Sequence, residues 1–192
     1  MHRGLAALAS ALTVASPSAL GIAAPAHAAG TQLLSCTISA EESFSPGVQM
    51  VSAPQSVGGV LHGLGQTAGP ACAPAADGIT SLDATFTGMG QASCFTDPAL
   101  RAVKLNGTMA ITWKKANGAA VGSSRVNWSA SQVDLGSTVL AGTVSSGVFK
   151  GATMSVTGLS ADAVISVTGG CSASSPLTSV RTTDTYLRLT QV

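Results

Sequence analysis

Four cysteines are the residues of this sequence best suited to chemistry. Cys36, Cys72, Cys94 and Cys171 are far apart along the chain, and no two of them form a C-x-x-C pair. This spacing disfavours a zinc site, because the ligands of structural zinc sites usually come in such pairs. Oxidation into two disulfides is the alternative, and it is typical of an exported chain. Four cysteines allow three pairings, and composition does not choose among them.

The neighbours of each cysteine favour one pairing. Cys36 alternates in step with apolar residues of a predicted strand, and so does Cys94, so both side chains should point into a core. Cys72 and Cys171 lie in Gly- and Pro-rich sequence that is typical of loops. We therefore predict a core disulfide between Cys36 and Cys94, and a second disulfide that joins the loops of Cys72 and Cys171.

Cys36 also ends the sequence Leu-Leu-Ser-Cys, which resembles the motif of acylated bacterial lipoproteins. That motif normally closes the apolar stretch of a leader directly, whereas Pro25, His27 and residues 30–32 intervene here. Acylation of Cys36 would also leave three cysteines, an odd number for a secreted protein. We therefore interpret Cys36 as half of a disulfide.

Acid–base chemistry has few candidates. His62 is the only histidine after residue 28, and we place it on one strand face with Val60 and Leu64. A histidine base also needs a nucleophile and an orienting group within hydrogen-bond reach, and no serine lies in a G-x-S-x-G sequence. The adjacent Glu41 and Glu42 should point to opposite faces of a strand, unlike the facing carboxylates of a glycosidase. We assign no catalytic, cofactor-binding or metal-binding residue and no cofactor, and favour a non-catalytic protein.

The first 28 residues have the pattern of a secretory signal peptide. Arg3 precedes an apolar run over residues 5–15, and Ala26-His27-Ala28 forms an A-x-A cleavage site. Serines and Pro17 interrupt the apolar run, which is too short for the roughly 20 residues of a membrane-spanning helix. We predict a signal peptide over residues 1–28 and a single secreted, extracellular domain over residues 29–192.

Charge narrows the range of partners. Charged residues make up 9% of the sequence, and the formal net charge is +1. Such a balance does not attract nucleic acid or an anionic membrane surface. We predict no nucleic-acid partner and no transmembrane segment, and leave a cell-wall component or a small molecule open as the ligand.

Alternation of apolar and polar residues predicts strands along much of the chain. Even positions from Leu82 to Cys94 should face inward, followed by the odd positions from Leu105 to Trp113. Asn117-Gly118 then favours a type I′ turn, after which Val126 and Trp128 should face inward. Further strands are predicted around residues 34–38, 60–66, 139–145, 154–157, 163–168 and 182–190. Eight or nine short strands favour an all-β, antiparallel β-sandwich of the immunoglobulin-like kind, with a β-barrel as the alternative.

A family resemblance accompanies this pattern. The order of Cys36, "SFSPGV" (residues 43–48), Cys72, "GQASC" (residues 90–94), "ITW" (residues 111–113), "GTVSSGVFKGATMSVT" (residues 142–157) and Cys171 resembles small secreted β proteins of unknown function from high-GC Gram-positive bacteria. The resemblance implies export and a β domain held by disulfides, and it supplies no activity and no site residue.

These observations favour an exported, non-catalytic module that acts outside the cell or at the cell wall. The first alternative is a carrier of a small apolar ligand, since Gly- and Ala-rich strand faces would leave a groove where large side chains are missing. The second alternative is a secreted hydrolase that uses His62, or a protease inhibitor whose exposed loop lies within residues 69–78.

Overall fold

The computed structural model describes residues 30–64, 70–73, 76–93, 103–132, 138–158 and 175–191. These residues form nine strands and one short 3-10 helix. The elements are β1 (Thr31–Val48), β2 (Ala53–Gly63), β3 (Cys72–Ala73), η1 (Ala76–Gly78), β4 (Ser81–Ala92), β5 (Val103–Lys114), β6 (Ala120–Gln132), β7 (Thr138–Gly147), β8 (Thr153–Thr157) and β9 (Leu177–Gln191). In the part of the chain so described, no helix has the length and apolar character needed to cross a membrane.

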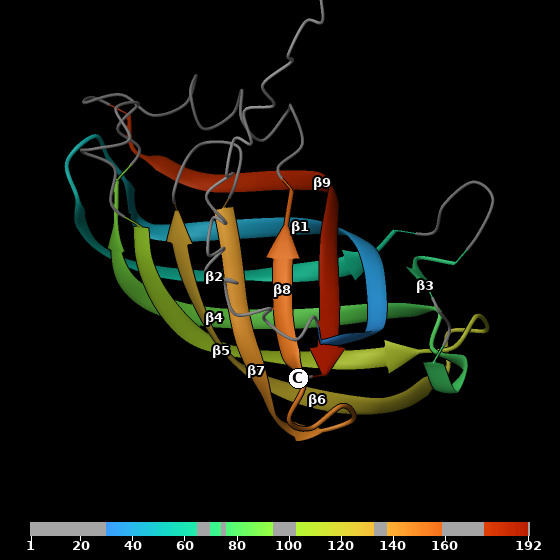
Figure 1. Cartoon of the computed structure of the whole chain (residues 1–192). Coiled ribbons are helices and arrows are strands. Elements are labelled where there is room, and N and C mark those ends of the chain that lie inside the picture. The colour runs from blue at the N-terminus through green and yellow to red at the C-terminus, as the bar shows by residue number, and fades with distance from the viewer. Residues whose placement is uncertain are drawn as a thin grey trace, which may run out of the picture.

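Eight of the strands close into one antiparallel barrel (Figure 1). Each pairs with the next along the chain, in the order β1, β2, β4, β5, β6, β7, β8 and β9, and β9 pairs back with β1. The short β3 continues the β2 edge of β1, where Cys72 lies opposite Cys36. The all-β, antiparallel prediction is confirmed, and the closed barrel is the alternative architecture predicted from the sequence.

The immunoglobulin-like sandwich that we favoured from the sequence is not the observed arrangement. Alternation along a strand reports which side chains are buried, and it is the same in a sandwich and in a barrel. The difference lies in the pairing of β9 with β1, which joins the two ends of the sheet. One contact across that seam, between Arg181 and Glu41, spans 140 residues of sequence. Strands so far apart in sequence pair without a local sequence pattern that could predict the pairing.

The strands of the barrel are strongly staggered. A line of paired residues that starts at Phe44 on β1 returns to β1 at Leu34, a displacement of ten residues (44 − 34). The line passes through Val57, Gly88, Gly107, Trp128, Gly142, Met154 and Leu189. For eight strands this stagger corresponds to a tilt of roughly 40°, and such a barrel is just wide enough to be filled by side chains or to hold one small ligand.

The inward-facing positions predicted on β4, β5 and β6 are confirmed. Their apolar side chains line the interior and are at most 8% exposed. They are Leu82, Ala84, Phe86 and Ala92 on β4, Leu105, Met109, Ile111 and Trp113 on β5, and Val126, Trp128 and Ala130 on β6. The strand predicted over residues 163–168 lies outside the described residues.

One end of the barrel is closed by the turn between β7 and β8, residues 148–152. Phe149 packs edge-to-face on Trp113, with ring centroids 5.4 Å apart. The indole Nε1–H of Trp113 donates a 2.8 Å hydrogen bond to Ser124 Oγ, and the Ser124 hydroxyl donates to the carbonyl oxygen of Val148. These contacts bind the turn to the ends of β5 and β6, so we call this the closed end.

The turn between β5 and β6 differs from the type I′ turn predicted from Asn117-Gly118. Gly118 has a positive φ of 81°, whereas the φ of Asn117 is not positive. Lys115 N donates to Ala119 O, and Gly118 N donates to Lys115 O, each at 2.9 Å. This pattern is a three-residue hairpin loop, in which only the last loop residue needs the left-handed region. A separate register shift between Trp113 and Lys114 leaves Val121 of β6 without a register partner on β5.

The described disulfide joins Cys36 on β1 to Cys72 on β3. Both residues are fully buried, and they face each other in register with their Cα atoms 3.9 Å apart. The predicted pairings of Cys36 with Cys94 and of Cys72 with Cys171 are therefore wrong. The reason is that Cys72, which we assigned to a loop, lies in a strand too short to show alternation. Cys94 and Cys171 themselves lie outside the described residues.

Candidate functional site

The barrel interior is tightly packed at the closed end and partly accessible toward the opposite end. Toward the closed end several inward side chains have no exposed surface, namely Leu34, Ile38, Leu82, Trp113 and Met154. Toward the β1–β2 turn (residues 49–52), several inward-facing residues keep intermediate exposure, namely Glu42, Phe44, Val103, Leu140 and Val156. We call this region the accessible half. The turn beside it is anchored by Gln55, whose side-chain amide makes two 3.0 Å hydrogen bonds with the backbone of Gly47.

Two aromatic rings occupy the middle of the interior. Phe86 and Trp128 pack edge-to-face, with centroids 5.9 Å apart and an interplanar angle of 84°. They lie over inward-facing glycines, since a Cβ atom on Gly88 would come within 2.6 Å of Trp128 Cζ2, and one on Gly59 within 2.7 Å of Phe86 Cζ. The glycine-rich faces therefore make room for these rings, and the groove that we expected at the glycines is filled. Both rings are themselves buried in the middle of the interior, at 5% and 4% exposure.

The indole N–H of Trp128 has no hydrogen-bond partner in the part of the chain that the structure describes. Trp128 is only 4% exposed, and its Nε1 atom is buried without any acceptor among the described residues. In Trp113, the other tryptophan of the chain, the same Nε1–H donates a hydrogen bond to Ser124 Oγ. Most buried polar atoms in folded proteins are hydrogen-bonded, and a buried donor without a partner carries a desolvation penalty. Trp128 can therefore donate to an acceptor that is brought into the interior.

Glu42 also faces the interior. It pairs in register with Gly59 on β2 and with Val180 on β9, neither of which offers it a polar side chain. Burial raises the pKa of the Glu42 carboxyl from its usual 4.5 to about 7. The residue nevertheless keeps part of its surface accessible. A carboxyl group that is desolvated and still reachable suits an incoming hydrogen-bond donor or cation.

The neighbouring Glu41 points outward, as we predicted for this adjacent pair. It is exposed, and Arg181 on β9 donates to its Oε1 atom through Nη2 at 2.5 Å. The two carboxylates therefore do not converge, and the arrangement does not match the facing pair of a glycosidase.

His62 lies on the outer face of the barrel and not in the core. Its neighbour Leu61 takes the inward position and is 4% exposed. His62 Nδ1 is 2.9 Å from Asp83 Oδ1, and Lys114 Nζ bonds to the other oxygen of Asp83. The hydrogen bonds from Lys114 and then from His62 lower the pKa of the Asp83 carboxyl. This group is an ion-pair cluster on the sheet surface, with the His62 and Asp83 side chains 53% and 42% exposed.

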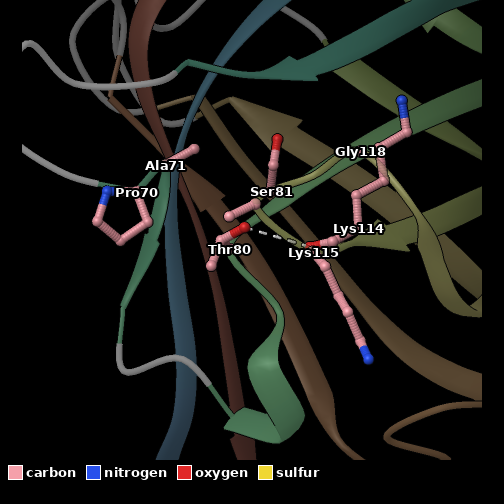
Figure 2. Close-up of a pocket in the computed structure, with 8 residues that line it drawn as sticks. Pro70, Ala71, Thr80, Ser81, Lys114, Lys115 and Gly118 are labelled. Carbon is pink, nitrogen blue, oxygen red and sulfur yellow. Dashed lines mark hydrogen bonds between the residues drawn. The ribbon is translucent and has the colours of Figure 1, made fainter.

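A pocket of about 550 Å³ lies beside this cluster, between the segment that precedes β4 and the β5–β6 turn (Figure 2). Its polar groups are largely engaged already. Thr80 donates to Lys114 O through both its N and its Oγ1, at 2.9 and 3.5 Å, and Lys114 Nζ is paired with Asp83. The side chains of Lys114 and Lys115 diverge (Figure 2). Few polar groups therefore converge on this pocket, and we favour the barrel interior as the functional site.

The described residues contain no candidate metal site, and the candidate inhibitor loop is described only in part. No group of three or more His, Cys, Asp or Glu side chains that could hold a metal ion occurs among them. Residues 69, 74 and 75 of the candidate inhibitor loop lie outside the described ranges. The described part of that loop is anchored, because Ala71 is 5% exposed and Cys72 is held by the disulfide.

The fold and the site together define a closed, antiparallel, eight-stranded barrel in which several inward-facing residues keep intermediate exposure toward one end. No family model matches the chain, and neither curated proteins nor solved structures gave a match. The function is therefore argued from the geometry of the interior.

Proposed function

We propose that this chain is an exported, non-catalytic barrel that binds a small, largely apolar molecule in the accessible half of its interior. The observation that carries the proposal is the buried Nε1–H of Trp128, which has no acceptor among the described residues. A ligand with one suitably placed acceptor would satisfy it. Eight-stranded antiparallel barrels are of the size that holds one such molecule.

The lining of the accessible half has the composition of a small-molecule site. Such sites combine mostly apolar and aromatic walls with a few polar groups that orient the ligand. Here Phe86, Trp128 and the partly exposed Leu140 and Val156 supply the walls. Trp128 Nε1 and the carboxyl group of Glu42 are the polar groups.

The site of action is proposed outside the cell. Support comes from the signal-peptide pattern of residues 1–28 and from the buried Cys36–Cys72 disulfide, a bond that forms and persists mainly in oxidising compartments. A hydrolase built on His62 is the weaker alternative, because that histidine lies on the exposed outer face with Asp83 and Lys114.

The proposal is tested with N-phenyl-1-naphthylamine, an uncharged dye whose fluorescence rises in apolar surroundings. We expect one dye per barrel in the protein recovered from culture medium. Val156→Trp would fill the accessible half and abolish binding, whereas Met89→Trp, at an outward position that is 67% exposed, would leave it unchanged. Circular dichroism shows whether each variant is folded, and Val103→Trp serves as a second filling variant. Dye binding that survives both filling variants, or no dye binding by the native protein, would contradict the proposal.

A further inference from the structure

Glu42 stands apart from the other ionisable groups around β1. Those on the neighbouring strands whose side chains are described are exposed on the outer face: His62 on β2, and Arg181, Tyr186 and Arg188 on β9. The inward-facing neighbours of Glu42 on the same strands are Gly59 and Val180. Among the described side chains, Glu42 therefore faces the interior without an opposite charge.

A ring lies next to this carboxyl group. Phe86 extends across Gly59, the register partner of Glu42, because a Cβ atom there would meet Phe86 Cζ at 2.7 Å and Cε1 at 2.8 Å. Phe86 in turn contacts Trp128 edge-to-face. Glu42, Phe86 and Trp128 thus follow one another around the interior, linked by Gly59 and by the contact of the two rings. Cations are attracted both by carboxylates and by the faces of aromatic rings.

We propose that the accessible half selects arylalkylamines, which carry a protonated alkylamine and an aromatic ring, with the ammonium group of the ligand paired with Glu42 and its ring packed on Phe86 and Trp128. This inference rests on the proposed function and names the ligand class of the same site. An ammonium group would supply the opposite charge that a desolvated carboxylate requires. A carboxylic acid would instead bring a like charge, and a neutral ligand would leave Glu42 without a partner.

The inference makes binding depend on pH with a defined sign. Burial raises the pKa of Glu42 to about 7, so the ionised fraction rises from about 3% at pH 5.5 to about 90% at pH 8. If only the ionised form binds the amine, the apparent affinity scales with that fraction and falls about 30-fold from pH 8 to pH 5.5. An alkylamine remains protonated across this range, so the change belongs to the protein.

The experiment measures displacement of N-phenyl-1-naphthylamine by 2-phenylethylamine, 2-phenylethanol and 3-phenylpropanoate at both pH values. The matched variants are Glu42→Gln and Glu41→Gln, which neutralise the inward and the outward carboxyl group of the adjacent pair. We expect the amine to compete best at pH 8 and to weaken about 30-fold at pH 5.5. Glu42→Gln should remove both the preference for the amine and its pH dependence, and Glu41→Gln should keep both.

The other outcomes distinguish the proposed amine selectivity from the proposed binding function. If the dye binds inside the barrel but the amine competes no better than the alcohol, or competes equally at both pH values, the amine selectivity is refuted while the binding function stands. The amine selectivity is likewise refuted if Glu41→Gln and Glu42→Gln change the competition equally. If neither the dye nor any of the three compounds binds, both proposals fail.

Discussion

Replacing Glu42 by glutamine should stabilise the protein, and by an amount that depends on pH. The folded protein holds the pKa of this carboxyl at about 7 against a usual 4.5 because burial disfavours the charged form. Between pH 4.5 and pH 7, Glu42 has lost its proton in the unfolded chain but keeps it in the folded protein. Stability linked to Glu42 is therefore fully present below pH 4.5 and is lost as the pH rises through 7.

The size of the effect follows from the shift of 2.5 pKa units (7 − 4.5). At 1.36 kcal/mol per unit, the loss above pH 7 is at most about 3 kcal/mol. Glutamine has a similar shape and cannot ionise, so Glu42→Gln should match the native protein at pH 4 and exceed its free energy of unfolding by up to about 3 kcal/mol at pH 8. For a domain of this size that corresponds to a rise in Tm of roughly 6 to 12 °C.

Urea denaturation at pH 4 and pH 8, followed by circular dichroism, measures the difference directly. Glu41→Gln is the control, because it removes an exposed ion pair with Arg181 and should cost less than about 1 kcal/mol at either pH. Comparing variants at each pH cancels the contributions of other titrating groups. A Glu42→Gln variant that is no more stable than the native protein at pH 8, or equally stabilised at pH 4, would refute the burial argued for this carboxyl group.

Three further predictions concern residues of the barrel outside the proposed binding site. Peptide mapping without reduction should recover a Cys36–Cys72 bond and leave Cys94 to pair with Cys171, and free thiols at Cys36 and Cys72 would contradict this. Replacing Cys36 and Cys72 together by alanine should lower the free energy of unfolding by about 2 to 4 kcal/mol, because the bond closes a separation of 36 residues. Asp83→Asn should cost at most about 1 kcal/mol and leave dye binding unchanged, because the cluster is open to solvent, with the Asp83, His62 and Lys114 side chains 42%, 53% and 32% exposed; lost binding would indicate a site on the outer face. Ser124→Ala should cost about 1 to 3 kcal/mol in urea denaturation because it leaves the buried Trp113 N–H without an acceptor; an unchanged midpoint would contradict the role given to this contact.

The facing of side chains along each strand could be predicted from sequence, because it depends only on the two-residue repeat of a strand. Phe86, Ile111 and Trp128 all take the inward positions assigned to them. The closure of the sheet could not be predicted this way, since it depends on the pairing of β9 with β1 across most of the chain. The cysteine pairing failed for a related reason: β3 has two residues, which is too few to show any repeat.

Only part of the candidate site could be predicted from the sequence. Glu42 shares its parity with Ile38 and Ala40, which are buried, so its inward direction follows from the pattern. That it lacks a partner depends on Gly59 and Val180, which only the strand register places beside it. The buried N–H of Trp128 is likewise a property of packing, because Trp113, with equally inward parity, finds Ser124, whereas Trp128 finds no acceptor among the described residues.

The central claim is that a small molecule binds inside the accessible half of the barrel, and the two indole N–H signals of a ¹H–¹⁵N spectrum test it most directly. The chain has only two tryptophans, and Trp128→Phe assigns the signals. Trp128 borders the accessible half, whereas the N–H of Trp113 is bonded to Ser124 at the closed end. We predict that N-phenyl-1-naphthylamine, added to saturation, moves the Trp128 signal and leaves that of Trp113 in place. A Trp128 signal that stays unchanged while the dye is bound would contradict the account.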